Sequence, residues 1–97
     1  MKLRFTPRAV ADLLSTADYL RERNPQAAVS VRAAILESLQ LLLRFPKLGR
    51  SQAVEGVRKL VTRKYGYLAY YRVDEETEEI VVLTIQHSAR DRPFSDA

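Results

Sequence analysis

The chain has 97 residues, no cysteine and a formal net charge of +4, with an isoelectric point of about 9.7. This length fits one domain, residues 1–97, and the lack of cysteine excludes disulfides and thiolate zinc sites. No apolar run approaches the roughly 20 residues of a membrane span. The positive charge favours an acidic partner, and without a signal-peptide pattern we expect a cytoplasmic protein.

The first 24 residues predict a short strand followed by a helix. Leu3 and Phe5 alternate with basic residues, as in a strand. Thr6 suits the N-cap of a helix, and Pro7 suits its first position. Apolar residues then recur at helical spacing at Val10, Leu13, Leu14, Ala17 and Leu20. The acidic residues of this segment lie away from that stripe, so we expect them to be solvated: Asp12, Asp18 and Glu22.

Asn24 and Pro25 break the first helix and start a second one, expected to run from about residue 25 to about residue 45. Its apolar face comprises Ala28, Val31, Ile35, Leu39 and Leu42. Two amphipathic helices joined by so short a turn form a helical hairpin. The apolar surface that they share needs a third partner, which a sheet can supply.

Pro46 and Gly49 open a loop, and three strand-like segments follow at residues 56–61, 65–73 and 80–86. The order β-α-α-β-β-β predicts an α+β domain, with the helical hairpin packed on one face of a small, mostly antiparallel sheet. The other face is then at least partly open. In the last strand we expect Val81, Leu83 and Ile85 to face the core, with His87 continuing their alternation.

Charge is distributed unevenly along this second half. Residues 44–72 contain a single acid, Glu55. Eight basic residues occupy the same span: Arg44, Lys47, Arg50, Arg58, Lys59, Arg63, Lys64 and Arg72. The acidic cluster at residues 74–79 follows directly and is most simply a solvated turn. Because nothing nearby in sequence neutralises the basic block, it predicts a surface for phosphates or acidic protein segments.

Several segments together resemble the RelE/ParE superfamily of toxins from bacterial type II toxin–antitoxin systems. They are Phe5-Thr6-Pro7-Arg8-Ala9 with Asp12-Leu13, Phe45-Pro46-Lys47-Leu48-Gly49-Arg50, Gly56-Val57-Arg58-Lys59-Leu60, Tyr70-Tyr71-Arg72-Val73 and Ile85-Gln86-His87-Ser88-Ala89-Arg90-Asp91. The resemblance covers nearly the whole chain and implies a helical hairpin on a small sheet. It also implies a cognate ParD-like antitoxin, with a homodimer of the toxin as an option within the complex.

Two activities are known in this superfamily, and both remain open at this point. ParE-like members poison DNA gyrase, whereas RelE-like members are ribosome-dependent mRNA endoribonucleases. The ending His87-Ser88-Ala89-Arg90-Asp91 is similar to the ParE type. RelE-like nucleases typically use a C-terminal tyrosine or histidine, and here no tyrosine follows Tyr71, whereas His87 leaves the histidine version open. The resemblance therefore implies a gyrase inhibitor, with the endoribonuclease as the alternative. A plain nucleic-acid-binding module would explain the charge but not the resemblance.

The candidate site residues differ between these activities. Those expected to bind a target are Arg58, Lys59, Arg63, Lys64, Arg72 and Arg90. In the nuclease alternative, Arg58 and Arg72 would stabilise charge on the scissile phosphate, and His87 would act as general acid or base. The simpler interpretation of His87 is a strand-end residue that hydrogen-bonds the C-terminal backbone. Arg90 and Asp91 either form a local ion pair, or Arg90 contacts the target.

The remaining candidates point to packing rather than chemistry. Four tyrosines could stack on bases, although strand packing is the simpler expectation: Tyr65, Tyr67, Tyr70 and Tyr71. With one histidine and no cysteine, we expect no metal site. No phosphate-binding glycine loop or catalytic triad is present in the sequence. We expect no cofactor and a protein that acts by binding.

Overall fold

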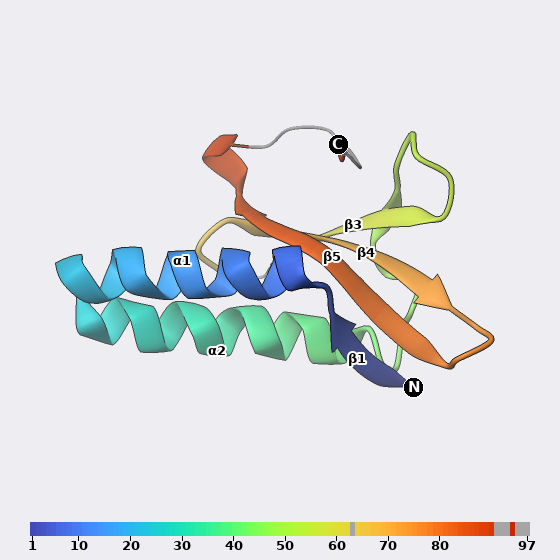
Figure 1. Ribbon diagram of the computed structural model, residues 1–97, viewed down its shortest axis with the longest axis horizontal. Helices are drawn as coiled ribbons and strands as arrows, with labels where there is room; N and C mark the ends of the chain where they lie inside the picture. Colours follow the sequence, from blue (N-terminus) through green and yellow to red (C-terminus); the bar gives the residue numbers. More distant parts are fainter. Residues whose placement is uncertain (63, 91–93, 95–97) are drawn as a thin grey trace.

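Two helices lie on one side of a five-stranded sheet (Figure 1). The computed structural model describes residues 1–62, 64–90 and Phe94. In chain order the elements are β1 (Lys2–Phe5), α1 (Pro7–Arg23), α2 (Pro25–Leu41), β2 (Arg50–Ser51), β3 (Val57–Val61), β4 (Tyr67–Asp74), β5 (Glu79–His87) and the 3-10 turn η1 (Ser88–Arg90). The predicted α+β class is confirmed, including the helical hairpin on the sheet.

The strands lie in the order β1-β5-β4-β3-β2. Within the described residues, β1 pairs with β5 in parallel and the other pairs are antiparallel. The short strand β2 was not predicted, because two residues carry no alternating pattern. The first strand therefore joins the sheet beside the last one, and the far ends of α1 and α2 extend beyond the sheet (Figure 1).

Capping residues fix both helix starts as predicted. The Thr6 side chain accepts a hydrogen bond from the Ala9 N–H at 3.1 Å, with Pro7 in the first helical position. Asn24 serves both helices: its N–H donates to the Leu20 carbonyl, and its side chain accepts from the Ala27 N–H at 3.2 Å. One residue is thus sufficient to join α1 to α2.

The second helix ends at Leu41, four residues before the predicted end near residue 45. After Leu41 the chain tightens, since the N–H groups of residues 42, 43 and 44 donate to carbonyls three residues earlier. Such tighter turns are common at helix ends. Residues 42–44 therefore curve toward the sheet and lead into the loop that contains Pro46.

The core lies between the helices and the sheet. It contains the predicted apolar face of α2 and the residues that β4 and β5 turn toward it: Val31, Ile35, Leu39, Leu42, Tyr67, Ala69, Tyr71, Ile80, Val82 and Ile85. The predicted stripe of α1 is only partly correct. Leu13 and Leu20 pack against this core, whereas Val10 and Leu14 are 43% and 58% exposed.

A β-bulge changes which residues of β5 face the core. Tyr70 pairs with Thr84 but Tyr71 pairs with Val82, so the register skips Leu83. The core residues are Ile80, Val82 and Ile85, and the expected set Val81, Leu83 and Ile85 is therefore wrong on two of three positions. An extra residue shifts the alternation of every residue before it.

Asp12 is not part of a solvated face, contrary to the sequence-based expectation. It is half-buried, and its Oδ2 accepts hydrogen bonds from the Thr84 hydroxyl and from the Ile85 N–H, the latter at 2.9 Å. These bonds tie α1 to β5 next to the bulge. Asp18 and Glu22 are exposed as predicted.

Among the described residues, the face of the sheet opposite the helices is buried in its centre and exposed along β3 and at the end of β4. In its centre Leu68, Tyr70 and Val81 are buried, and the Phe94 ring lies with its centroid 5.8 Å from that of Tyr70. Val61 on β3 is 59% exposed. The expected open face is thus reduced to a region along β3 and the end of β4.

Candidate functional site

The basic residues of β3 and β4 divide between the two faces of the sheet. Arg58 pairs with Tyr71, a core residue, and so lies on the helix-facing side. Lys59 pairs with Tyr70, and Arg72 pairs with Val57, which places both cations on the opposite side. The structure therefore brings Lys59 and Arg72 together and separates Arg58 from them.

Arg58 is bound to the loop that follows α2. Its guanidinium donates to the Gly49 carbonyl at 2.7 Å and to the Lys47 carbonyl at 3.3 Å. Both bonds come from the same guanidinium nitrogen, Nη1, and they fix the loop against the edge of β3. Arg58 is thus a structural residue in this conformation, a role that the charge pattern did not reveal.

Lys59, Arg72 and the exposed side chain of Val61 lie on the same side of the sheet. We call this surface the basic face. The two cations are diagonal neighbours on adjacent antiparallel strands. Arg72 is exposed, and Lys59 is half-buried. Adjacent cations with an apolar neighbour suit an acidic protein surface or a phosphate chain.

The other predicted cations lie outside this face or outside the described residues. Lys64 is exposed in the turn between β3 and β4. Arg63 lies outside the described residues, as do the side chain of Arg90 and all of Asp91. The expected Arg90–Asp91 pair accordingly stays a prediction.

His87 ends β5 and bonds to the backbone that follows it. Its Nδ1 accepts from the Ala89 N–H at 3.1 Å, and its ring meets that of Tyr67 edge-to-face with centroids 5.0 Å apart. This is the bond expected of a strand-end histidine. Because Nδ1 accepts this hydrogen bond, the neutral imidazole carries its proton on Nε2. His87 is exposed, so Nε2 is accessible to other groups.

The three residues of the nuclease alternative do not converge. His87 pairs with Tyr67, whereas Arg72 lies five residues further along β4, which is about 17 Å of extended strand. Arg58 points to the other face and is bound to the loop. A general base and the cations that stabilise one phosphate must reach the same group, and this arrangement does not provide that.

Three of the four strand tyrosines are buried, as expected for packing residues: Tyr67, Tyr70 and Tyr71. Burial raises the pKa of Tyr71, while its bond with Gly49 and the charge of Arg58 act in the opposite direction. Burial likewise raises the pKa of Tyr67, with Tyr19 adding to it. Tyr65, 49% exposed in a turn, is the one tyrosine of this group open to a partner.

A second candidate site is an apolar groove between the helices, which we call the hairpin groove. It has a volume of about 250 Å³. Its lining is apolar except for Thr16 and Arg32: Phe5, Leu13, Leu14, Ala17, Leu20, Ala28, Val31, Ile35 and Leu36. A groove of this composition suits the apolar face of a partner helix. Sequence patterning missed it, because Leu14 was assigned to the core.

No group of three or more metal-ligating side chains gathers anywhere in residues 1–62, 64–90 and 94. In the same part of the chain, neither helix is long and apolar enough to cross a membrane.

Comparison with known proteins gives consistent matches. The family model described as "ParE toxin of type II toxin-antitoxin system, parDE" matches residues 3–92. The Y4kP protein of Sinorhizobium fredii (strain NBRC 101917 / NGR234) is 29% identical over 92 residues, 95% of this chain and 93% of that protein.

Two solved structures extend the comparison. A chain of the chromosomal ParDE toxin–antitoxin system from P. aeruginosa is 30% identical, with a TM-score of 0.77, and the match covers 90% of this chain and 95% of that one. A chain of the RelBE2 toxin–antitoxin complex from Mycobacterium tuberculosis is 26% identical, with a TM-score of 0.58 and coverage of 89% and 95%.

The fold and these matches define a toxin of the RelE/ParE superfamily. Within it, the chain belongs to the family of ParE toxins of type II toxin–antitoxin systems, because the family model covers nearly its whole length.

Proposed function

We propose that this toxin inhibits DNA gyrase and is neutralised by a cognate ParD-like antitoxin in the cytoplasm. The match of the ParE toxin family model to residues 3–92 carries the proposal. The similarity to a chain of a ParDE system, at 30% identity and a TM-score of 0.77, supports it further. Gyrase inhibition is the activity that the resemblance to ParE-like toxins implies.

The geometry of the candidate residues favours a binding mechanism over catalysis. Arg58 is committed to the loop, and His87 accepts a backbone hydrogen bond at the end of β5, remote from Arg72. Lys59 and Arg72 are neighbouring cations on the side of the sheet opposite the helices, where Arg72 is exposed. We infer that the basic face contacts acidic groups of the target, with Lys64, Arg63 and Arg90 as further candidates.

The hairpin groove is a surface of this toxin that suits an antitoxin. The hairpin groove offers about 250 Å³ of mostly apolar lining between α1 and α2. Leu14, at its rim, is 58% exposed. A disordered antitoxin segment that becomes helical on binding would cover these side chains. Burial of this apolar area would offset the conformational entropy that the segment loses when it becomes ordered.

The RelE-like endoribonuclease is the second candidate function. One observation favours it: the His87 ring is exposed, so its Nε2 is accessible to a substrate. The similarity to a chain of the RelBE2 complex keeps this activity in view.

Expressing the toxin and measuring DNA breakage and mRNA integrity in the same culture separates the two candidates. Gyrase inhibition predicts gyrase-linked DNA breaks, loss of negative supercoiling by purified gyrase, and intact mRNA at early times. Codon-phased cleavage of ribosome-bound mRNA, with gyrase activity unaffected, would contradict gyrase inhibition and support the endoribonuclease. If the toxin inhibits gyrase by binding to it, adding the antitoxin should restore gyrase activity.

A further inference from the structure

The turn between β3 and β4 holds a tyrosine in a backbone conformation that tyrosine disfavours. Tyr65 and Gly66 both have a φ of +67°, and two consecutive positive φ angles are characteristic of type I′ turns. Glycine adopts this conformation freely, whereas a residue with a Cβ is strained in it. Such turns prefer asparagine before the glycine, so the turn by itself does not explain a tyrosine at this position.

Contacts with neighbouring elements explain Gly66 but not Tyr65. A Cβ at Gly66 would lie 2.9 Å from the Ser88 Oγ. Among the described residues, the other non-glycine residue with a positive φ is Glu78, whose carbonyl accepts the Lys2 N–H at 3.0 Å and so joins β1 to the sheet. The Tyr65 side chain forms no hydrogen bond, ion pair or ring contact with another described residue. Strain that no internal contact offsets points to a function outside the chain.

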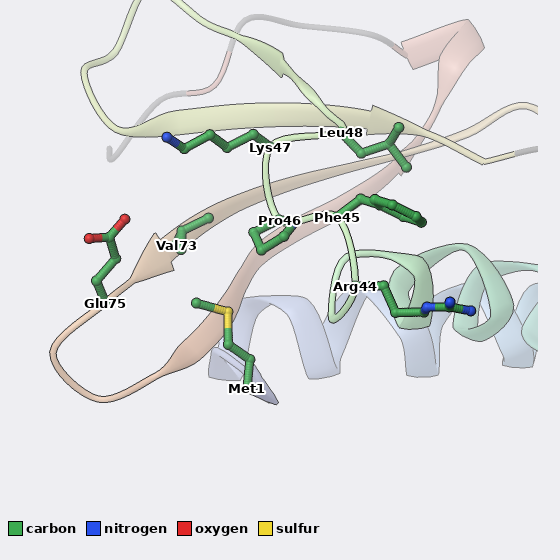
Figure 2. Close-up of a pocket in the computed structure, with 8 residues that line it drawn as sticks. All are labelled: Met1, Arg44, Phe45, Pro46, Lys47, Leu48, Val73 and Glu75. Atoms are coloured by element: carbon green, nitrogen blue, oxygen red, sulfur yellow. The ribbon is translucent and has the colours of Figure 1, made fainter.

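The other exposed aromatic side chains in the described part of the chain have a partner within it. They are Tyr19 and Phe45. The guanidinium carbon of Arg23 lies 3.8 Å from the ring centroid of Tyr19, and that of Arg44 lies 5.9 Å from the ring centroid of Phe45. Figure 2 shows Arg44 and Phe45 in the loop that follows α2, at the border of a hollow of about 520 Å³. Within the described residues, Tyr65 is thus the exposed aromatic residue that has no such neighbour.

Hydrogen bonds fix this turn from both flanks. The Thr62 hydroxyl donates to the Lys64 carbonyl at 2.8 Å and accepts from the Tyr67 N–H at 3.2 Å. Thr62 itself is buried. On the other flank, the Ser88 N–H donates to the Gly66 carbonyl at 2.7 Å. The turn is therefore preformed, and a partner that binds to it does not have to order the backbone there.

We propose that Tyr65 is an anchor that inserts into an apolar pocket of the protein that this toxin inhibits. Tyrosine is enriched among the residues that dominate protein interfaces, because its ring fills a pocket and its hydroxyl can meet a polar group. Lys64 beside it is exposed, and no acid lies between Glu55 and Asp74 in the sequence, so the pocket has an acidic rim. The anchor presupposes the proposed function, in which the toxin acts by binding a protein.

A protein pocket suits Tyr65 better than a nucleic acid does. Proteins that bind single strands stack successive bases on exposed rings along a cationic groove. The other tyrosines of β4 are buried, so they offer no row of rings beside Tyr65: Tyr67, Tyr70 and Tyr71. A single ring in a rigid turn instead matches one cavity in a partner.

Replacing the ring without straining the turn tests this anchor. Tyr65→Asn introduces the residue that type I′ turns prefer, so the thermal unfolding midpoint should stay unchanged or rise by up to about 8 °C. Growth inhibition should fall, and the toxin concentration that halves supercoiling by purified gyrase should rise at least about thirtyfold. Tyr65→Phe keeps the ring and should stay within about fivefold of the wild type.

A second exposed tyrosine provides the matched control. Tyr19 is 54% exposed, close to the 49% of Tyr65, and it lies on α1. Tyr19→Ala should leave both growth inhibition and the inhibition of supercoiling unchanged. Circular dichroism establishes that every variant is folded, and mRNA integrity is measured in the same cultures.

Full toxicity of the folded Tyr65→Asn protein overturns the proposal. A lowered unfolding midpoint also overturns it, because the ring would then stabilise the fold itself. If the wild type cleaves ribosome-bound mRNA and Tyr65→Asn abolishes that cleavage, the turn contacts RNA and the protein pocket is wrong. If the wild type affects neither gyrase nor mRNA while Tyr65→Asn loses its toxicity, gyrase inhibition fails, but the anchor stands for another protein target.

Discussion

The Tyr71 hydroxyl and the Gly49 N–H, 22 residues apart in sequence, lie 2.8 Å from each other in a buried hydrogen bond. The same hydroxyl donates to the Pro46 carbonyl. Gly49 leaves no space for a side chain here, since a Cβ would lie 2.6 Å from Cε1 of Tyr71 and 2.9 Å from the Lys59 carbonyl oxygen. A core tyrosine thereby determines the path of the loop between α2 and β2.

Tyr71→Phe should lower the free energy of unfolding by about 1–3 kcal/mol, because it leaves the buried Gly49 N–H without an acceptor. Gly49→Ala should cost a similar amount, because the methyl group meets backbone as well as a ring. Urea denaturation measures both. Tyr65→Phe, at a tyrosine that is 49% exposed, serves as control and should change stability by about 0.5 kcal/mol or less. Equal effects at positions 65 and 71 would contradict the role of this hydroxyl.

Stability should decline in alkaline solution, and Tyr71 should account for part of that decline. Burial raises its folded-state pKa above the ordinary value of 10.0. Above that value the unfolded chain loses the proton while the folded chain keeps it, so folding stability is intact below pH 10 and falls as the pH rises further. Unfolding midpoints measured between pH 8 and 11 should therefore fall less steeply for Tyr71→Phe than for the wild type. Parallel curves would refute the contribution.

Asp12→Ala should destabilise the protein by about 1–3 kcal/mol, because the Ile85 N–H and the Thr84 hydroxyl both lose their acceptor. Asp18→Ala is the matched control on the same helix, where the carboxylate forms an exposed pair with Arg21. Its loss should cost at most about 1 kcal/mol. Thermal unfolding of the two variants gives the comparison, and a neutral Asp12→Ala would show that α1 does not need this link to β5.

Replacing Lys59 and Arg72 by glutamate should reduce growth inhibition strongly while the protein stays folded, if the basic face contacts the target. The control reverses two exposed arginines on α1, Arg21 and Arg23, which gives the same change in net charge elsewhere. Growth after induction and circular dichroism are measured on the same variants. Full toxicity of the folded K59E/R72E protein would remove the basic face as the target site.

Arg58→Ala tests whether Arg58 stabilises the fold through its bonds to the loop, in contrast to the exposed Arg72. We expect a loss of stability, because the Gly49 carbonyl loses a donor at 2.7 Å and hydrogen bonds to charged groups contribute about 1.5–3 kcal/mol. Arg72→Ala should be nearly neutral for folding, since that side chain is exposed. A stability change confined to Arg72→Ala would reverse the assignment of the two arginines.

His87→Gln should leave most of the toxicity intact. A general acid or base contributes about 100- to 10,000-fold to a rate, and glutamine cannot titrate, so a nuclease that depends on His87 would lose nearly all activity. A gyrase inhibitor would lose only the packing of the ring on Tyr67 and the bond from the Ala89 N–H. Supercoiling by purified gyrase and cleavage of ribosome-bound mRNA are read in parallel.

Local chemistry in the sequence was sufficient to predict both helices and the four longer strands of this fold. Thr6, Pro7 and Asn24 carry their capping preferences wherever they occur, and the apolar spacing of α2 defines its buried face without reference to the rest of the chain. The ordinary backbone bond of His87 was likewise expected from its place at a strand end. These features depend on residues only a few positions apart.

Tertiary structure alone decided how the site is assembled. Arg58 and Lys59 are adjacent in one basic run, yet a strand turns them to opposite faces, and only packing against the helices showed which face is the core. The bulge at Leu83 reset the alternation of β5, and Asp12 found its partners 72 and 73 residues away. Contacts at such separation depend on how the layers meet, and no periodicity within one segment records that.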